Sequence, residues 1–331
     1  MVKDGIFNGC RYNASIPEIF QTLLFRSVYV LRIKQGLLLE SGIMAGIPVL
    51  DGQLQIFNVD HGQCALLTMP RPGGFSRVLI DCGHSVDFNG VPWYSGAHLA
   101  GMGVTFIDML ICTNYDEDHM SGYPDLIQRG ISVGCILGNP TVSPETIVYL
   151  KTEDGMGSGI EAVASSLAAR RDIGWKQNPP LISGVNLTWT YNPHPFFDDE
   201  NNLSLVATLD INGFRFMFPG DMETRGWNNL LATCPQFRQT VAGVHVLIAA
   251  HHGRDNGICK NIFDIYGCRP KLIVISDDYK QYSTQETTDY YLSKAQGIEG
   301  YRGRSGMRYV LTTRRDGEIR FSFQNGRCVV Y

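Results

Sequence analysis

The chain has 331 residues, of which 44% are hydrophobic and 18% are charged. This balance predicts a globular protein with a sizeable core and excludes a disordered chain. The net charge of −4 excludes a protein that coats nucleic acid through its overall charge, although it leaves room for a local basic patch.

Residues 1–45 differ in character from the rest of the chain. The stretch 15–39 predicts one amphipathic helix, with Ser15 and Pro17 in its first turn. Two interpretations stay open, a docking helix and a leader sequence, and Met44 is a second candidate for the translation start. We expect one further domain over residues 46–331, because no linker or internal repeat divides that part.

Short apolar runs separated by glycine and proline turns predict strands from residue 53 onwards. These runs lie at 54–59, 64–69, 76–81, 106–113, 135–139, 186–191, 203–211, 214–221, 244–253 and 271–277. Helices are predicted within 121–130, 145–171, 227–233 and 284–295, and a closing hairpin is predicted from 308–313 and 318–323. Alternating strands and helices favour a layered α/β fold.

The nine cysteines are scattered, and none forms a C-x-x-C pair. This spacing argues against a thiolate zinc site, and the odd number without clusters predicts reduced thiols in a cytoplasmic protein. We expect no membrane span, because Arg26, Arg32 and Lys34 interrupt the nearest apolar stretch, residues 20–39.

Three polar clusters follow buried strands, at residues 113–122, 220–223 and 251–257. Carboxylates and imidazoles that converge on one sheet edge need compensation, and a divalent cation supplies it most simply. The spacing of Asp116, Asp118 and His119 also suits two metal ions about 4 Å apart. A solvated loop with helix-capping aspartates is the alternative, and the three similar strand ends favour the metal.

These motifs resemble the metallo-β-lactamase superfamily, and within it the ComEC-like group of DNA-uptake competence proteins. The resemblance covers about residues 53–323. It rests on FNVDHGQCALL, VLIDCG, TNYDEDHMSG, NNLSLV, FPGDME, AAHHG and SDDYKQYSTQET, taken in order. The resemblance implies an αββα sandwich that holds one or two divalent ions at one edge of two facing sheets.

The resemblance also implies two sets of metal ligands. One position would be offered Asn114, Asp116, Asn202 and Asp221, and the other Asp118, His119, Asp221 and His251. Asn114 and Asn202 stand where the superfamily has histidines, so the first position is expected to bind Mg²⁺ or Mn²⁺ better than Zn²⁺.

The two adjacent histidines receive different expected roles. His251 is favoured as the ligand, because the preceding strand is expected to end there. His252 is expected to orient a ligand or to donate a proton to the leaving group, with a packed histidine as the alternative. Asp81 is expected to fix the metal loop through hydrogen bonds, and His61 is a weaker candidate for lining the site.

Several basic residues are candidates for binding phosphate. Arg254, directly after the two histidines, is the strongest of them. The others are Arg302, Arg304, Arg308, Arg314, Arg315 and Arg320, with Tyr279, Lys280 and Tyr282 just before them. Tyrosines in such a region can stack on bases. A solvated basic surface is the alternative.

The leading hypothesis is a metal-dependent phosphodiesterase or nuclease, in which Asp118 orients a water activated by the metal. Its expected partner is a phosphodiester substrate, with nucleic acid implied by the resemblance. The alternatives are a small-molecule or cyclic-nucleotide phosphodiesterase, and a degenerate binding module that has lost its first metal position. Metal content and hydrolysis of a generic phosphodiester distinguish these hypotheses.

Overall fold

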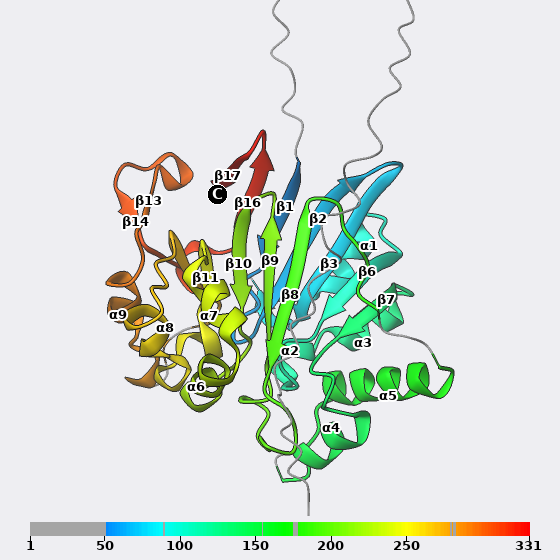
Figure 1. The fold of residues 1–331 in the computed structure, drawn as a ribbon. Helices are drawn as coiled ribbons and strands as arrows, with labels where there is room; N and C mark the ends of the chain where they lie inside the picture. Colours follow the sequence, from blue (N-terminus) through cyan, green and yellow to red (C-terminus); the bar gives the residue numbers. More distant parts are fainter. Residues whose placement is uncertain (1–50, 89, 154, 175–177, 279, 281–282) are drawn as a thin grey trace, which may run out of the picture.

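The structure is a computed structural model that describes residues 51–331, apart from 89, 154, 175–177, 279 and 281–282 (Figure 1). The helix predicted within residues 1–45 and the predicted domain boundary lie outside the described residues. The same holds for Tyr279 and Tyr282, which were expected to stack on bases.

The first of two large sheets has seven strands. In spatial order these are β17 (Arg327–Val330), β16 (Ile319–Gln324), β1 (Gly52–Ile56), β2 (Cys64–Arg71), β3 (Gly74–Cys82), β6 (Phe106–Ile111) and β7 (Ser132–Leu137). The strands from β17 to β3 pair antiparallel, whereas β3, β6 and β7 run parallel to one another. A parallel pair directs its carboxyl ends to one edge of the sheet.

The second sheet has six strands. In spatial order these are β15 (Val310–Thr312), β12 (Leu272–Ile275), β11 (Val246–Ile248), β10 (Phe214–Phe218), β9 (Leu205–Ile211) and β8 (Val185–Tyr191). The four strands from β15 to β10 are parallel. Two small ribbons add β4 (Ser85–Phe88) with β5 (Val91–Trp93), and β13 (Ile298–Glu299) with β14 (Met307–Arg308).

The two large sheets face each other and enclose the central core. Phe216 of β10 packs between the sheets, with ring centroids 4.9 Å from Phe321 and 5.9 Å from Phe323 of β16. Strands buried on both faces place successive side chains in different cores. In β2, Leu67 belongs to the central core and Leu66 to the core beneath the helices.

Helices cover the outer face of each sheet (Figure 1). The seven-stranded sheet packs against α1 (Ser95–Gly101), α2 (Glu117–Met120), α3 (Tyr123–Gln128), α4 (Pro144–Leu150) and α5 (Ser158–Asp172). The six-stranded sheet packs against α6 (Thr224–Thr233), α7 (Pro235–Ala242), α8 (Lys260–Asp264) and α9 (Thr288–Leu292). Within the described part of the chain, no helix combines the length and apolar character needed to cross a bilayer. The layers form the predicted αββα sandwich.

The predicted hairpin near the carboxyl end is wrong. β15 pairs with β12 in one sheet and β16 with β1 in the other, and α10 (Thr313–Asp316) carries the chain between them. The carboxylate of Asp316 accepts a hydrogen bond from the N–H of Thr312 at 2.9 Å and one from Arg308 at 2.8 Å. This local turn makes the chain cross between sheets, and the hairpin is formed instead by β16 and β17.

Most cysteines of the described residues are buried in the core. Seven in the described part of the chain are free thiols, and six of these are buried. Cys112, for example, lies in the core between the first sheet and its helices, as a small apolar side chain does.

Candidate metal centre

The ionisable residues of the predicted site lie where four strands end. β3 and β6 are parallel neighbours in one sheet, and β10 and β11 are parallel neighbours in the other. Asp81 lies near the end of β3, and the loop after β6 carries residues 113–119. Asp221 follows β10, and His251 and His252 follow β11. Both sheets therefore deliver polar side chains to the same edge of the sandwich.

Four side chains converge at this edge, namely those of Asp118, His119, Asp221 and His252. One potential ligand atom from each lies within 4.8 Å of the others. Nε2 of His119 is 3.0 Å from Oδ1 of Asp221. Nε2 of His252 is 3.0 Å from Oδ2 of Asp118 and 3.5 Å from Oδ1 of Asp221. Only Asp118, with 25% of its side chain exposed, opens the cluster towards solvent.

Hydrogen bonds on the far side of both rings fix their orientation. Nδ1 of His252 lies 2.9 Å from the carbonyl oxygen of Ser276, and that oxygen can only accept. Nδ1 of His119 lies 2.9 Å from Oδ2 of Asp81. Each Nδ1 therefore carries the proton, and each Nε2 points at the carboxylates. Metal-ligating histidines in proteins are held in this way.

Asp81 supports the loop, as predicted, without joining the cluster. Its carboxylate accepts hydrogen bonds from the N–H of Thr113 at 2.7 Å, the hydroxyl of Thr113 and the amide of Gln63 at 3.1 Å. The residue is fully buried and has a positive φ of 54°. Asp81 thus ties the end of β3 to the start of the loop that carries Asp118 and His119.

The charges in the cluster stabilise one another. Burial alone would lower the pKa of His252, but Asp221 and Asp118 outweigh burial and raise this pKa to about 10. Burial is likewise outweighed at His119, where Asp221 and Asp81 raise the pKa well above its ordinary value. Burial disfavours the charge on Asp118, yet His119 and His252 lower its pKa to about 2.

The cluster fits a divalent cation. A tetrahedral ion about 2.1 Å from each ligand places the ligand atoms about 3.4 Å apart, and the 3.0 Å and 3.5 Å contacts bracket this spacing. Nε2 of His252 is buried and makes no hydrogen bond within the described part of the chain. A cation would take the place of the two imidazole protons, since metal binding releases protons from its ligands.

His251, which the sequence favoured as the ligand, lies outside this cluster. Its Nε2 is 3.8 Å from Oδ2 of Asp221 and 3.3 Å from Nη1 of Arg254. A guanidinium has only donors, so the lone pair of Nε2 is already engaged by Arg254. The geometry therefore favours His252 over His251 as the ligand, and it leaves His252 no free nitrogen for donating a proton to a leaving group.

The asparagines proposed for the first metal position are held by other contacts. The amide nitrogen of Asn114 donates to Ser204 at 3.1 Å, while its oxygen is buried without a partner among the described residues. Asn202 uses both ends of its amide. It donates to Asp199 at 2.9 Å and accepts from the N–H of Gly226 at 2.7 Å. The amide oxygen of Asn202 therefore already accepts a hydrogen bond, whereas that of Asn114 has no partner among the described residues.

Asp116, the remaining residue of that position, has a basic partner. Nζ of Lys151, the residue that ends α4, contacts Oδ1 of Asp116 and lies 2.9 Å from Oε1 of Glu200. Sequence reasoning missed Lys151, because a lysine 35 positions away at a helix end follows no local pattern. It also missed Ser276, although a polar residue directly after a buried strand is the pattern that identified the other clusters.

Arg254, the strongest candidate for binding phosphate, lies beside the cluster. Its guanidinium contacts Nε2 of His251 at 3.3 Å and Nε2 of His61 at 3.4 Å. His61 in turn lies 3.5 Å from Oδ2 of Asp118, so it lines the site. Burial, together with the charge of His252, lowers the pKa of His61 to about 4 and keeps this ring neutral at pH 7. Arg254 therefore places a positive charge beside the site.

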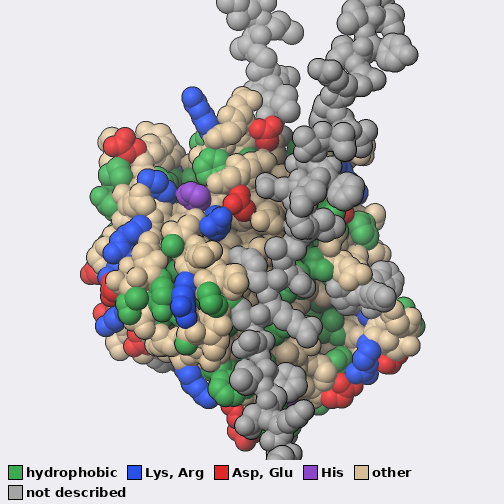
Figure 2. Space-filling model, viewed as in Figure 1, with side chains coloured by type: hydrophobic (Ala, Val, Ile, Leu, Met, Phe, Trp, Pro, Cys, Tyr) green, Lys and Arg blue, Asp and Glu red, His purple; other side chains and the backbone are tan. Residues whose placement is uncertain are grey.

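The arginines near the carboxyl end do not form one free basic surface. Four of the six are engaged locally: Arg302 with the carbonyl of Glu318, Arg308 with Asp316, Arg314 with Asp277, and Arg320 with Glu318. On the part of the face that is visible in Figure 2, basic and acidic side chains are interspersed. This arrangement favours the solvated basic surface over a dedicated phosphate-binding strip.

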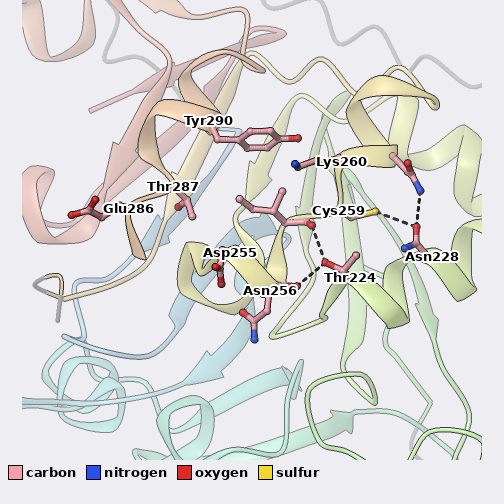
Figure 3. A pocket seen from close by; sticks show the side chains of 11 residues that line it. Thr224, Asn228, Asp255, Asn256, Cys259, Lys260, Glu286, Thr287 and Tyr290 are labelled. Atoms are coloured by element: carbon pink, nitrogen blue, oxygen red, sulfur yellow. Dashed lines mark hydrogen bonds between the residues drawn. The ribbon is translucent and has the colours of Figure 1, made fainter. Parts of the chain in front are cut away.

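A separate cavity of about 680 Å³ lies between α6, α8 and α9. Figure 3 shows Tyr290 and Lys260 on one side of it and Thr224 and Asn256 on the other. None of the four cluster residues lines this cavity. It adjoins the metal edge, since Asn256 donates a hydrogen bond of 2.7 Å to Glu223, whose carboxylate lies 3.7 Å from Nδ1 of His251.

The chain is similar to one curated relative in sequence and to several solved structures in fold. No family model matches it. ComE operon protein 3 of Bacillus subtilis (strain 168) is 24% identical over 243 residues, which is 69% of this chain and 29% of that protein. The chain therefore spans less than a third of the length of this relative.

Two solved structures are similar in arrangement. The metallo-β-lactamase fold protein YhfI from Bacillus subtilis has a TM-score of 0.45 and 10% identity, covering 82% of this chain and 99% of that chain. CmlA, a diiron β-hydroxylase from Streptomyces venezuelae, has a TM-score of 0.45 and 12% identity, covering 83% of this chain and 54% of that chain. In its αββα layers the chain resembles the metallo-β-lactamase fold, and in sequence it is similar to ComE operon protein 3.

Proposed function

We propose that this chain is a metal-dependent hydrolase that cleaves phosphodiester bonds, with nucleic acid as its substrate class. The observation that carries the proposal is the cluster of two carboxylates and two oriented imidazoles, Asp118, Asp221, His119 and His252. Buried groups of this kind at the ends of several strands are typical of catalytic metal sites rather than of structural ion pairs.

A bound divalent ion supplies a Lewis acid and lowers the pKa of the water that attacks the substrate. Asp118, the exposed member of the cluster, orients that water by accepting a hydrogen bond from it. Arg254 faces the same edge and donates to a phosphoryl oxygen, since a guanidinium binds phosphate through parallel N–H groups. His61 is neutral and cannot act as an acid at pH 7.

The resemblance to the ComEC-like group supports a nucleic-acid substrate. A metal-chelated and reloaded sample is assayed with Mn²⁺, Mg²⁺ or Zn²⁺ on single-stranded DNA, double-stranded DNA, RNA and bis(p-nitrophenyl) phosphate. Cleavage of a polynucleotide that Asp118→Ala abolishes supports the proposal. Cleavage of small diesters alone supports the small-molecule alternative. A metal-loaded protein that hydrolyses none of these substrates refutes the phosphodiesterase.

The two variants separate chemistry from binding. Asp118→Ala removes a ligand and the group that orients the water, so kcat falls by orders of magnitude. Arg254→Ala raises KM with little change in kcat, provided that its contact is equally strong in the ground and transition states. Arg308→Ala is the matched control, because Arg308 pairs with Asp316 away from the cluster.

A further inference from the structure

Lys151 occupies an unexpected place beside the metal edge. Its side chain is only 6% exposed, and its ammonium touches Asp116 and Glu200. Asp116 is the residue that the resemblance assigned to a first metal ion. The carboxylate that would coordinate this ion therefore already holds a cation supplied by the chain itself.

The ammonium of Lys151 contacts two carboxylates, those of Asp116 and Glu200. A buried charge is tolerated only when it is paired, and here one ammonium serves two carboxylates. A divalent ion at Asp116 would have to share a ligand oxygen with this ammonium, and the two cations would repel each other at close range.

The other expected ligands do not compensate for this repulsion. Both ends of the Asn202 amide are used, by Asp199 and Gly226. Asn114 contributes one free oxygen, which carries no charge. Only Asp221 remains of the expected set, and it belongs to the assembled cluster. A second ion would thus have a single shared carboxylate and one neutral amide oxygen.

We infer that this chain binds one divalent ion, at Asp118, His119, Asp221 and His252, and that the ammonium of Lys151 takes the place of a second. Lys151 is then a positioning residue, which neutralises Asp116 and Glu200 and holds the loop that carries Asp118. The inference rests on the metal centre of the proposed function and is independent of the substrate.

The metal content of the folded protein tests this inference. The full chain is stripped with a chelator, reloaded with excess Mn²⁺ or Zn²⁺ and desalted, and metal is counted by mass spectrometry against protein. The wild type is expected to hold one ion per chain. Lys151→Met removes the charge but keeps the apolar stem, so two carboxylates are left without a cation, and the count is expected to rise towards two.

Lys294→Met is the matched control, because Lys294 also pairs with a carboxylate, Asp264 at 2.7 Å, but lies on the α8–α9 side. Its metal count is expected to stay at one. Asp116→Asn provides a second route if Lys151→Met fails to fold by circular dichroism. The inference predicts that Asp116→Asn still holds one ion, whereas a two-metal centre predicts a fall from two to one.

Each result decides between distinct explanations. Two tightly held ions in the wild type overturn the inference but leave the proposed hydrolase intact. A folded Lys151→Met variant that stays at one ion overturns the role assigned to the ammonium. A wild type that holds no ion refutes the metal centre itself, and with it the proposed function.

Discussion

Alanine variants of the two adjacent histidines test the ligand assignment directly. Nε2 of His252 is 3.0 Å from Asp118, and its Nδ1 is held by Ser276, so this ring is oriented for a metal. Nε2 of His251 faces Arg254 instead. We expect His252→Ala to abolish tight metal binding and His251→Ala to preserve it.

The expected difference follows from the two environments. Loss of an outer partner of a ligating imidazole costs about 10–100-fold in metal affinity. His252→Ala removes the ligand itself, so we expect a loss of at least about 100-fold, or about 2.8 kcal/mol. His251→Ala disturbs Asp221 only through a 3.8 Å contact, so its loss should stay at or below about 10-fold, the lower end of that range.

Competition with a chromophoric chelator measures both affinities for Zn²⁺ and Mn²⁺ at fixed pH. Circular dichroism shows whether each variant is folded, and the wild type provides the reference. A folded His252→Ala variant that binds as tightly as the wild type, together with a large loss in His251→Ala, would reverse the assignment. It would show that the sequence prediction of His251 is right and that the oriented lone pair of His252 is not used.

Three further predictions concern the support of the site, its protonation and the core. Asp81→Asn weakens the hydrogen bond to Nδ1 of His119, so metal affinity should fall about 10–100-fold by the same chelator competition, without loss of fold. In the metal-free protein, the raised pKa of His252 stabilises the fold fully below pH 6.5, and this contribution is lost as pH rises through about 10. Urea unfolding should show that loss in chelated but not in metal-loaded protein. Phe216→Ala should cost about 3–5 kcal/mol in unfolding free energy, and an unchanged stability would refute its role between the sheets.

The strands of the two large sheets, apart from β17, were predictable because each of them is an apolar run. All twelve predicted strands correspond to observed strands, since burial on both faces leaves a signature several residues long. Among the described residues, five α-helices were not predicted, namely α1, α2, α7, α8 and α10. Each has eight residues or fewer, which is too short for a 3.6-residue period to show. The helix predicted over 284–295 is shorter in the structure, where α9 spans only Thr288–Leu292.

Pairing between strands was less predictable than the strands themselves. The run R-R-D-G after β15 suits a tight turn, and nothing in the apolar pattern tells whether the next strand returns to the same sheet. The choice depends on Asp316, whose carboxylate takes the N–H of Thr312, and on open edges at β12 and β1. Those edges are formed by strands that lie far away in the sequence.

In the site, too, the residue types were predictable from the sequence, whereas the backbone conformation was not. The residue types and the strand-end positions of Asp118, His119 and Asp221 follow from the sequence. The choice between His251 and His252 depends instead on backbone angles, because both residues have a φ of 52° in the left-handed region.

Non-glycine residues rarely adopt this region, and such conformations cost about 1–3 kcal/mol each unless the surrounding structure imposes them. Here the carbonyl of Ser276 holds the ring of His252, and the guanidinium of Arg254 holds the ring of His251. An apolar pattern that ends at Ile248 carries no information on how the next four residues turn. A substitution that relaxes this turn should therefore exchange or merge the environments of the two histidines, even though it changes no ligand.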